Sequence, residues 1–108
     1  MTARPIRLVD QTSTDVACLN VALVGDIYRG SICLDETPAH LRRLFEEFEE
    51  SVEGQMFTLA DEIEQKISVI PLKVIFANGR EAAVEDLQVF PSTNRVSFKA
   101  RETSKITS

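Results

Sequence analysis

Few residues in this chain of 108 have side chains and spacings that suggest catalysis. His40 is the only histidine, and no GxSxG, HExxH or glycine-rich phosphate loop accompanies it. Adjacent carboxylates also occur, as at Glu49 and Glu50, but acid–base catalysis by such a pair requires a pocket that separates their pKa values. The sequence therefore predicts no catalytic residue, no metal site and no cofactor.

Cys18 and Cys33 are the remaining reactive groups, and they lack the CxxC spacing of redox motifs and zinc sites. Gly25 and Asp26 separate two β-rich runs, and a two-residue turn there places the two cysteines directly opposite each other. Such a hydrogen-bonded pair has Cα atoms about 5.5 Å apart, which permits a disulfide without requiring one. We expect two reduced thiols on neighbouring strands, and a redox-active thiol pair is the alternative.

The charge balance restricts the classes of partner. Lys and Arg number 12 against 17 Asp and Glu, which gives a net charge of -5 and disfavours binding to a phosphate backbone. The N-terminal residues contain no apolar run of signal-peptide length, and no apolar stretch approaches the ~20 residues of a membrane span. We expect a cytoplasmic protein that binds neither nucleic acid nor membranes.

The segment from Thr37 to Ile67 is the longest with helical periodicity. Its apolar residues recur every three or four positions, about 3.7 on average, which is close to the period of an α-helix. Glycine inside a helix lowers helix stability by about 1 kcal/mol relative to alanine. Gly54 could therefore divide the segment into two helices. The apolar phase continues across Gly54, from Val52 to Met56, and this continuity favours a single long helix.

Strand-like runs flank this segment on both sides. The N-terminal runs are 4–10, 16–24 and 27–35, and the C-terminal runs are 69–77, 80–84, 87–90 and 95–100. The predicted fold is therefore α+β: an antiparallel sheet of three N-terminal and three to four C-terminal strands packed on one long central helix. We expect a single domain over residues 1–108, with frayed ends at 1–3 and about 101–108.

Phe57 suggests a homodimer. On a continuous helix it lies in the acidic face, between Glu50 and Glu53, where a partner is needed to cover it. Such a helix is about 43 Å long, against a diameter of about 34 Å for a globule of this size. The first hypothesis is a non-enzymatic binding or regulatory protein that dimerises through Gly54, Met56 and Phe57.

Two further hypotheses remain. An acidic inhibitor, of the immunity or antitoxin type, would cover a basic active site of its partner with Glu46, Glu50, Glu53 and Asp61, although solvated acidic faces are common on helices. A small-ligand binder or enzyme would need a pocket between helix and sheet. The residues that suggest such a pocket are Tyr28, Cys33 and His40.

Overall fold

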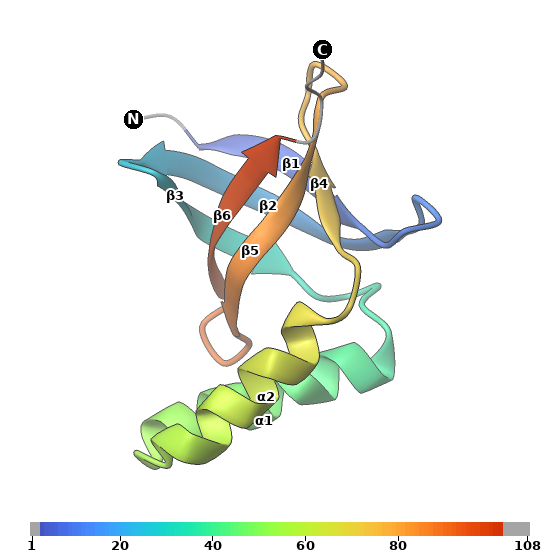
Figure 1. The fold of residues 1–108 in the computed structure, drawn as a ribbon. Coiled ribbons are helices and arrows are strands. Elements are labelled where there is room, and N and C mark those ends of the chain that lie inside the picture. The colour runs from blue at the N-terminus through green and yellow to red at the C-terminus, as the bar shows by residue number, and fades with distance from the viewer. Residues whose placement is uncertain (1–2, 103–108) are drawn as a thin grey trace.

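The chain forms a closed antiparallel barrel with a helical hairpin across one end (Figure 1). A computed structural model describes residues 3–102, and residues 1–2 and 103–108 lie outside the described part. The elements in chain order are β1 (Arg4–Val9), β2 (Asp15–Val24), β3 (Ile27–Cys33), α1 (Ala39–Glu53), α2 (Phe57–Ser68), β4 (Lys73–Ile75), β5 (Glu81–Phe90) and β6 (Arg95–Glu102). The last strand thus includes the first two residues of the predicted C-terminal frayed segment.

The predicted sheet packed on a helix is wrong, because the strands wrap into a barrel in the order β1-β2-β3-β6-β5-β4. β1 is no edge strand, since it pairs with both β2 and β4. Closure pairs every strand with two neighbours and directs one face of each strand toward a common interior. The predicted strands 80–84 and 87–90 are one strand, β5, which bulges near Asp86.

The single long helix is also wrong, because the chain reverses direction between α1 and α2. Gln55 adopts a left-handed conformation with φ 60°. The N–H of Met56 donates to the Ser51 carbonyl at 2.8 Å, and the N–H of Gln55 donates to the Val52 carbonyl at 3.0 Å. These two bonds form a Schellman motif, which ends α1 with Gln55 in the position that glycine usually occupies.

The predicted register of the β2–β3 hairpin is confirmed. Cys18 pairs with Cys33, and Leu23 pairs with Tyr28, across a turn in which Gly25 has φ +67°. A two-residue loop fixes the register of both strands, so local turn chemistry was sufficient here. β4 and β5 also pair as a hairpin, with Asn78 and Gly79 in the turn between them.

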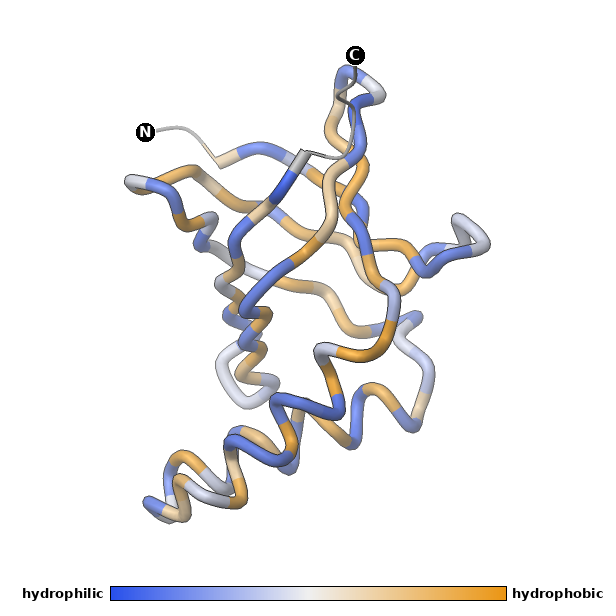
Figure 2. Tube along the Cα trace, in the orientation of Figure 1, coloured by the Kyte–Doolittle hydropathy of each residue, from blue (hydrophilic) through white to orange (hydrophobic). Residues whose placement is uncertain are grey.

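The core fills the barrel and continues into the hairpin. Figure 2 shows apolar residues alternating along the strands and recurring along both helices. Leu8, Val74 and Phe98 are almost completely buried within the barrel. Such buried side chains fill the middle of the barrel, as in other small barrels.

The helical hairpin closes one end of this barrel. Phe45 of α1 and Ile63 of α2 are buried in the same core cluster as the barrel residues. The rings of Phe48 and Phe90 have centroids 5.9 Å apart, and they connect α1 to the end of β5. Within the described range, neither helix is long and apolar enough to cross a membrane.

Candidate functional site

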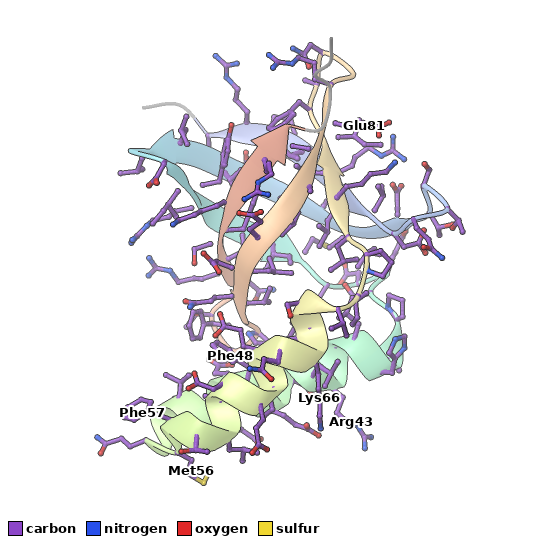
Figure 3. All side chains as sticks on the ribbon, in the orientation of Figure 1. Arg43, Phe48, Met56, Phe57, Lys66 and Glu81 are labelled. Atoms are coloured by element: carbon purple, nitrogen blue, oxygen red, sulfur yellow. The ribbon has the colours of Figure 1, made fainter. Side chains whose placement is uncertain are left out.

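The hairpin tip brings together the residues predicted to form an interface. Gly54 lies in the connection between the helices, next to Met56 and Phe57. The side chains of Phe57 and Met56 are 61% and 49% exposed, and Figure 3 shows them leaving the tip in different directions. Leu59, whose spacing assigned it to the buried stripe, is 42% exposed. The exposure of Phe57 agrees with the prediction, although a helix end produces it and not the middle of a long helix.

Carboxylates surround this tip. Glu46, Glu50, Glu53 and Asp61, the predicted acidic surface, are all exposed. Arg42 lies 3.9 Å from Glu46 and partly neutralises it. Between Arg43 and Lys66 the sequence contains eight carboxylates and no Lys or Arg. The tip is therefore an apolar surface in a region of strongly negative charge.

The residues proposed for a pocket between helix and sheet do not come together. Tyr28 lies near the end of the barrel opposite the helices, whereas His40 is exposed in the first turn of α1. Cys18 and Cys33 are exposed free thiols that face each other across β2 and β3. A cavity of about 290 Å³ does separate α2 from β5, but neither Tyr28 nor Cys33 nor His40 lines it.

The open end of the barrel contains a larger cavity, of about 690 Å³. We call it the mouth, and it lies at the end of the barrel away from the helical hairpin. Its lining residues are Arg4, Pro5, Ile6, Val21, Ala22, Leu23, Tyr28, Phe76, Ala77, Asn78 and Arg80. Sequence reasoning found Tyr28 but missed the two arginines and Phe76.

Strand register explains how charged and apolar residues meet at the mouth. Arg4 pairs with Val21, which is buried in the barrel, so Arg4 occupies an inward-facing position at the start of β1. The alternation of Arg4 with Ile6 and Leu8 was the available signal. It was missed because the strands were predicted to form a sheet packed on a helix and not a barrel wall.

No metal site is evident between residues 3 and 102, since no cluster of three or more His, Cys, Asp or Glu residues has suitable geometry. Comparisons of the chain with protein-family models, with curated proteins and with solved structures find no match. The two candidate sites therefore have to be interpreted from their own chemistry.

Proposed function

We propose that this chain is a non-enzymatic protein-binding module whose hairpin tip docks on a partner with a basic surface. One observation carries the proposal: Met56, Phe57 and Leu59 are exposed at the end of a hairpin that carries many carboxylates. Protein interfaces typically combine a few large apolar residues with a polar rim. Complementary charge in the rim accelerates encounter and selects the partner.

Charge favours a foreign partner over a second copy at the tip. Two identical tips would bring Glu50, Glu53 and Asp61 close to the same carboxylates, and like charges in contact oppose association. A partner rich in Lys and Arg would instead gain from these carboxylates. An inhibitor of the immunity or antitoxin type, which covers a basic active site, is one form of this function.

A homodimer is the second candidate, and Arg43 and Lys66 favour it. Among the described residues neither has a carboxylate within ion-pair distance. Both point away from the barrel near the base of the hairpin in Figure 3. An antiparallel arrangement of two hairpins would bring these cations toward the acidic tip of the other copy, and would cover Phe57.

The oligomeric state separates the two candidates. Light scattering of the wild type and of Phe57→Asp should give a monomer for both if the partner is foreign. A wild-type dimer that Phe57→Asp dissociates would replace the first candidate with the second. The antiparallel dimer should also weaken at high salt, because screening weakens the attraction of Arg43 and Lys66 to the acidic tip of the other copy.

A binding experiment tests the first candidate directly. The probe is a synthetic amphipathic helix with Lys on one face and Leu on the other, compared with a Lys-only peptide of equal charge. We expect the amphipathic peptide to bind more tightly, to lose affinity at high salt, and to lose its advantage in Phe57→Ser. Equal binding of both peptides, or no effect of Phe57→Ser, would contradict docking through the tip.

A matched pair of charge variants completes the design. Glu50→Gln, Glu53→Gln and Asp61→Asn together remove three charges from the tip. The control variant removes three charges elsewhere, from the exposed residues Asp26, Asp35 and Glu36. Both variants lose the same net charge, and we expect the tip variant to bind the peptide more weakly than the control variant does. An equal loss in both variants would show that net charge alone attracts the peptide.

A further inference from the structure

The mouth of the barrel has the size of a small-molecule site. Its volume of about 690 Å³ falls within the range of roughly 300 to 1,000 Å³ that ligand pockets occupy. Ile6 and Val21, both buried, contribute to its apolar surface, while Leu23 is partly exposed to solvent. The helical hairpin covers the opposite end of the barrel (Figure 1).

Aromatic rings form one wall of the mouth. The ring of Tyr28 stacks on Phe98, with centroids 5.3 Å apart and an interplanar angle of 14°. The ring centroids of Tyr28 and Phe76 are 5.8 Å apart, and the planes of these two rings are tilted by 44°. Phe98 is buried and fixes the position of Tyr28. Across the described residues, the Tyr28 hydroxyl has no hydrogen-bond partner, so it is available to a ligand.

The charge of the mouth is opposite to that of the protein. Two arginines, Arg4 and Arg80, line the cavity, and no described residue that lines it carries a carboxylate. Arg4 has no ion-pair partner in the described part of the chain. A guanidinium is a good donor to planar anions such as carboxylates, and to phosphates. In a chain of net charge -5, a cationic pocket indicates selection for an anion.

We propose that the mouth binds a small amphipathic anion, a carboxylate or phosphate that carries an alkyl or aromatic body. The anionic group contacts Arg4, with Arg80 contributing positive charge to the same cavity. The apolar body lies against Ile6, Val21 and the rings of Tyr28 and Phe76. The proposal does not depend on the function of the hairpin tip, which lies at the other end of the molecule.

Probes of matched size separate the charge from the apolar body. Decanoate, decan-1-ol and decylamine share an alkyl chain, and 2-naphthoate replaces that chain with a planar aromatic body. Isothermal titration and amide chemical shifts would measure the affinity and the location of each probe. We expect the two carboxylates to bind more tightly than the alcohol, and the amine least tightly. The shifts should cluster around Tyr28 and Phe76.

Two pairs of variants locate the site. Arg4→Gln removes the inward-facing cation and should weaken decanoate binding about tenfold, as expected for the loss of a charged hydrogen bond. Its control is Arg29→Gln, an exposed cation next to Tyr28 that does not line the mouth. Leu23→Glu adds a carboxylate to the mouth and should abolish decanoate binding, whereas Val24→Glu adds the same charge at the adjacent exposed position outside the cavity.

Specific results would overturn the proposal. They are equal affinity for decanoate and decan-1-ol, equal losses in Arg4→Gln and Arg29→Gln, and failure of both carboxylates to bind at millimolar concentration. Inorganic phosphate that binds as tightly as decanoate would show that the apolar surface plays no part. Phe57→Asp should leave decanoate affinity unchanged, because Phe57 lies far from the mouth. The hairpin proposal and the mouth proposal can therefore fail independently of each other.

Discussion

The carboxylate of Glu49 accepts two hydrogen bonds from Ser92, one from its backbone N–H at 3.0 Å and one from its hydroxyl. Glu49 belongs to α1 and is only 7% exposed, while Ser92 lies in the turn between β5 and β6. A buried carboxylate is costly unless donors satisfy it. The pair therefore connects the helical hairpin to the barrel through a polar contact, beside the apolar contact of Phe48 with Phe90.

Loss of the Ser92 hydroxyl should weaken this connection. Ser92→Ala removes one of the two donors to a buried charge, and we expect the free energy of unfolding to fall by about 1.5 to 3 kcal/mol. Chemical denaturation would measure the change. Thr93→Ala is the control, because the Thr93 hydroxyl makes only a long 3.4 Å bond on the surface and its loss should have little effect. Equal stability of Ser92→Ala and wild type would show that the bond contributes nothing.

The left-handed conformation of Gln55 offers a stabilising substitution. A residue with a Cβ is strained at φ 60°, whereas glycine adopts this conformation without penalty. We therefore expect Gln55→Gly to raise the free energy of unfolding by about 1 kcal/mol. Gly54 has φ -83°, which suits alanine, but an added Cβ would lie 3.2 Å from the Glu50 carbonyl oxygen, so we expect no stabilisation from Gly54→Ala. Stabilisation by Gly54→Ala but not by Gln55→Gly would indicate a different geometry at the helix end.

Gly30 should tolerate no side chain. A Cβ at this position would lie 2.1 Å from the Asn20 carbonyl oxygen and 2.7 Å from the Val21 Cα, both backbone atoms of the neighbouring strand. Since backbone atoms cannot rotate aside, we expect Gly30→Ala to destabilise the barrel by about 3 kcal/mol or more. Thermal unfolding, compared with the exposed neighbour Ser31→Ala, would measure this loss. A melting temperature within a few degrees of wild type would contradict the close approach.

The turn between β1 and β2 depends on ionised Asp10. The Thr12 hydroxyl, followed by the backbone N–H of Thr14, donates to this carboxylate and lowers the pKa of Asp10 below its ordinary value. A lowered folded pKa stabilises the protein fully above the unfolded value of about 3.9, and the contribution is lost as pH falls through the folded pKa. In ¹³C NMR titration, Thr12→Val should raise the pKa of Asp10, while Gln11→Ala should leave it unchanged.

The sequence was informative wherever a short loop determines the structure. The turn at Gly25 and Asp26 fixed every pair from Cys18–Cys33 to Val24–Ile27. The loop 91–94 likewise predicts the observed pairing of Val89 with Val96, but the pairing of Leu87 with Phe98 in the same register is absent, because the register shifts between Glu85 and Gln88. In such hairpins, loop length and turn type determine which residues are opposite, so local residues are sufficient.

The break in the helical segment was missed because no residue around it strongly disfavours a helix except Gly54. Gln55 is a good helix former, yet it adopts the left-handed conformation that ends α1. The apolar phase continues across the break because both helices bury one face against the same barrel end. Continuity of phase therefore did not require continuity of the helix, and the predicted overhang of a long helix does not exist.

Barrel closure depends on contacts between distant segments. β3 pairs with β6, and β1 pairs with β4, although about 65 residues separate the members of each pair. Nothing local specifies these pairings, and β4 itself has only three residues. For the same reason the mouth was missed: it forms only where the ends of β1, β2 and β3 meet the turn between β4 and β5. Phe57 was correctly predicted to be exposed, but for the wrong reason, since it begins α2 and does not lie in the middle of a long helix.

Because β4 is short, its pairing with β1 is the weak point of the barrel wall, and we call this pairing the β1–β4 seam. Only three residue pairs, from Arg7–Ile75 to Val9–Lys73, hold β1 to β4, whereas β2 and β3 share seven. Amide protons along this seam should exchange with deuterium earlier than those of β2 and β3, because fewer hydrogen bonds must open. Phe76 directly follows β4 and lines the mouth beside Tyr28, so opening of the β1–β4 pairing would change the shape of the mouth.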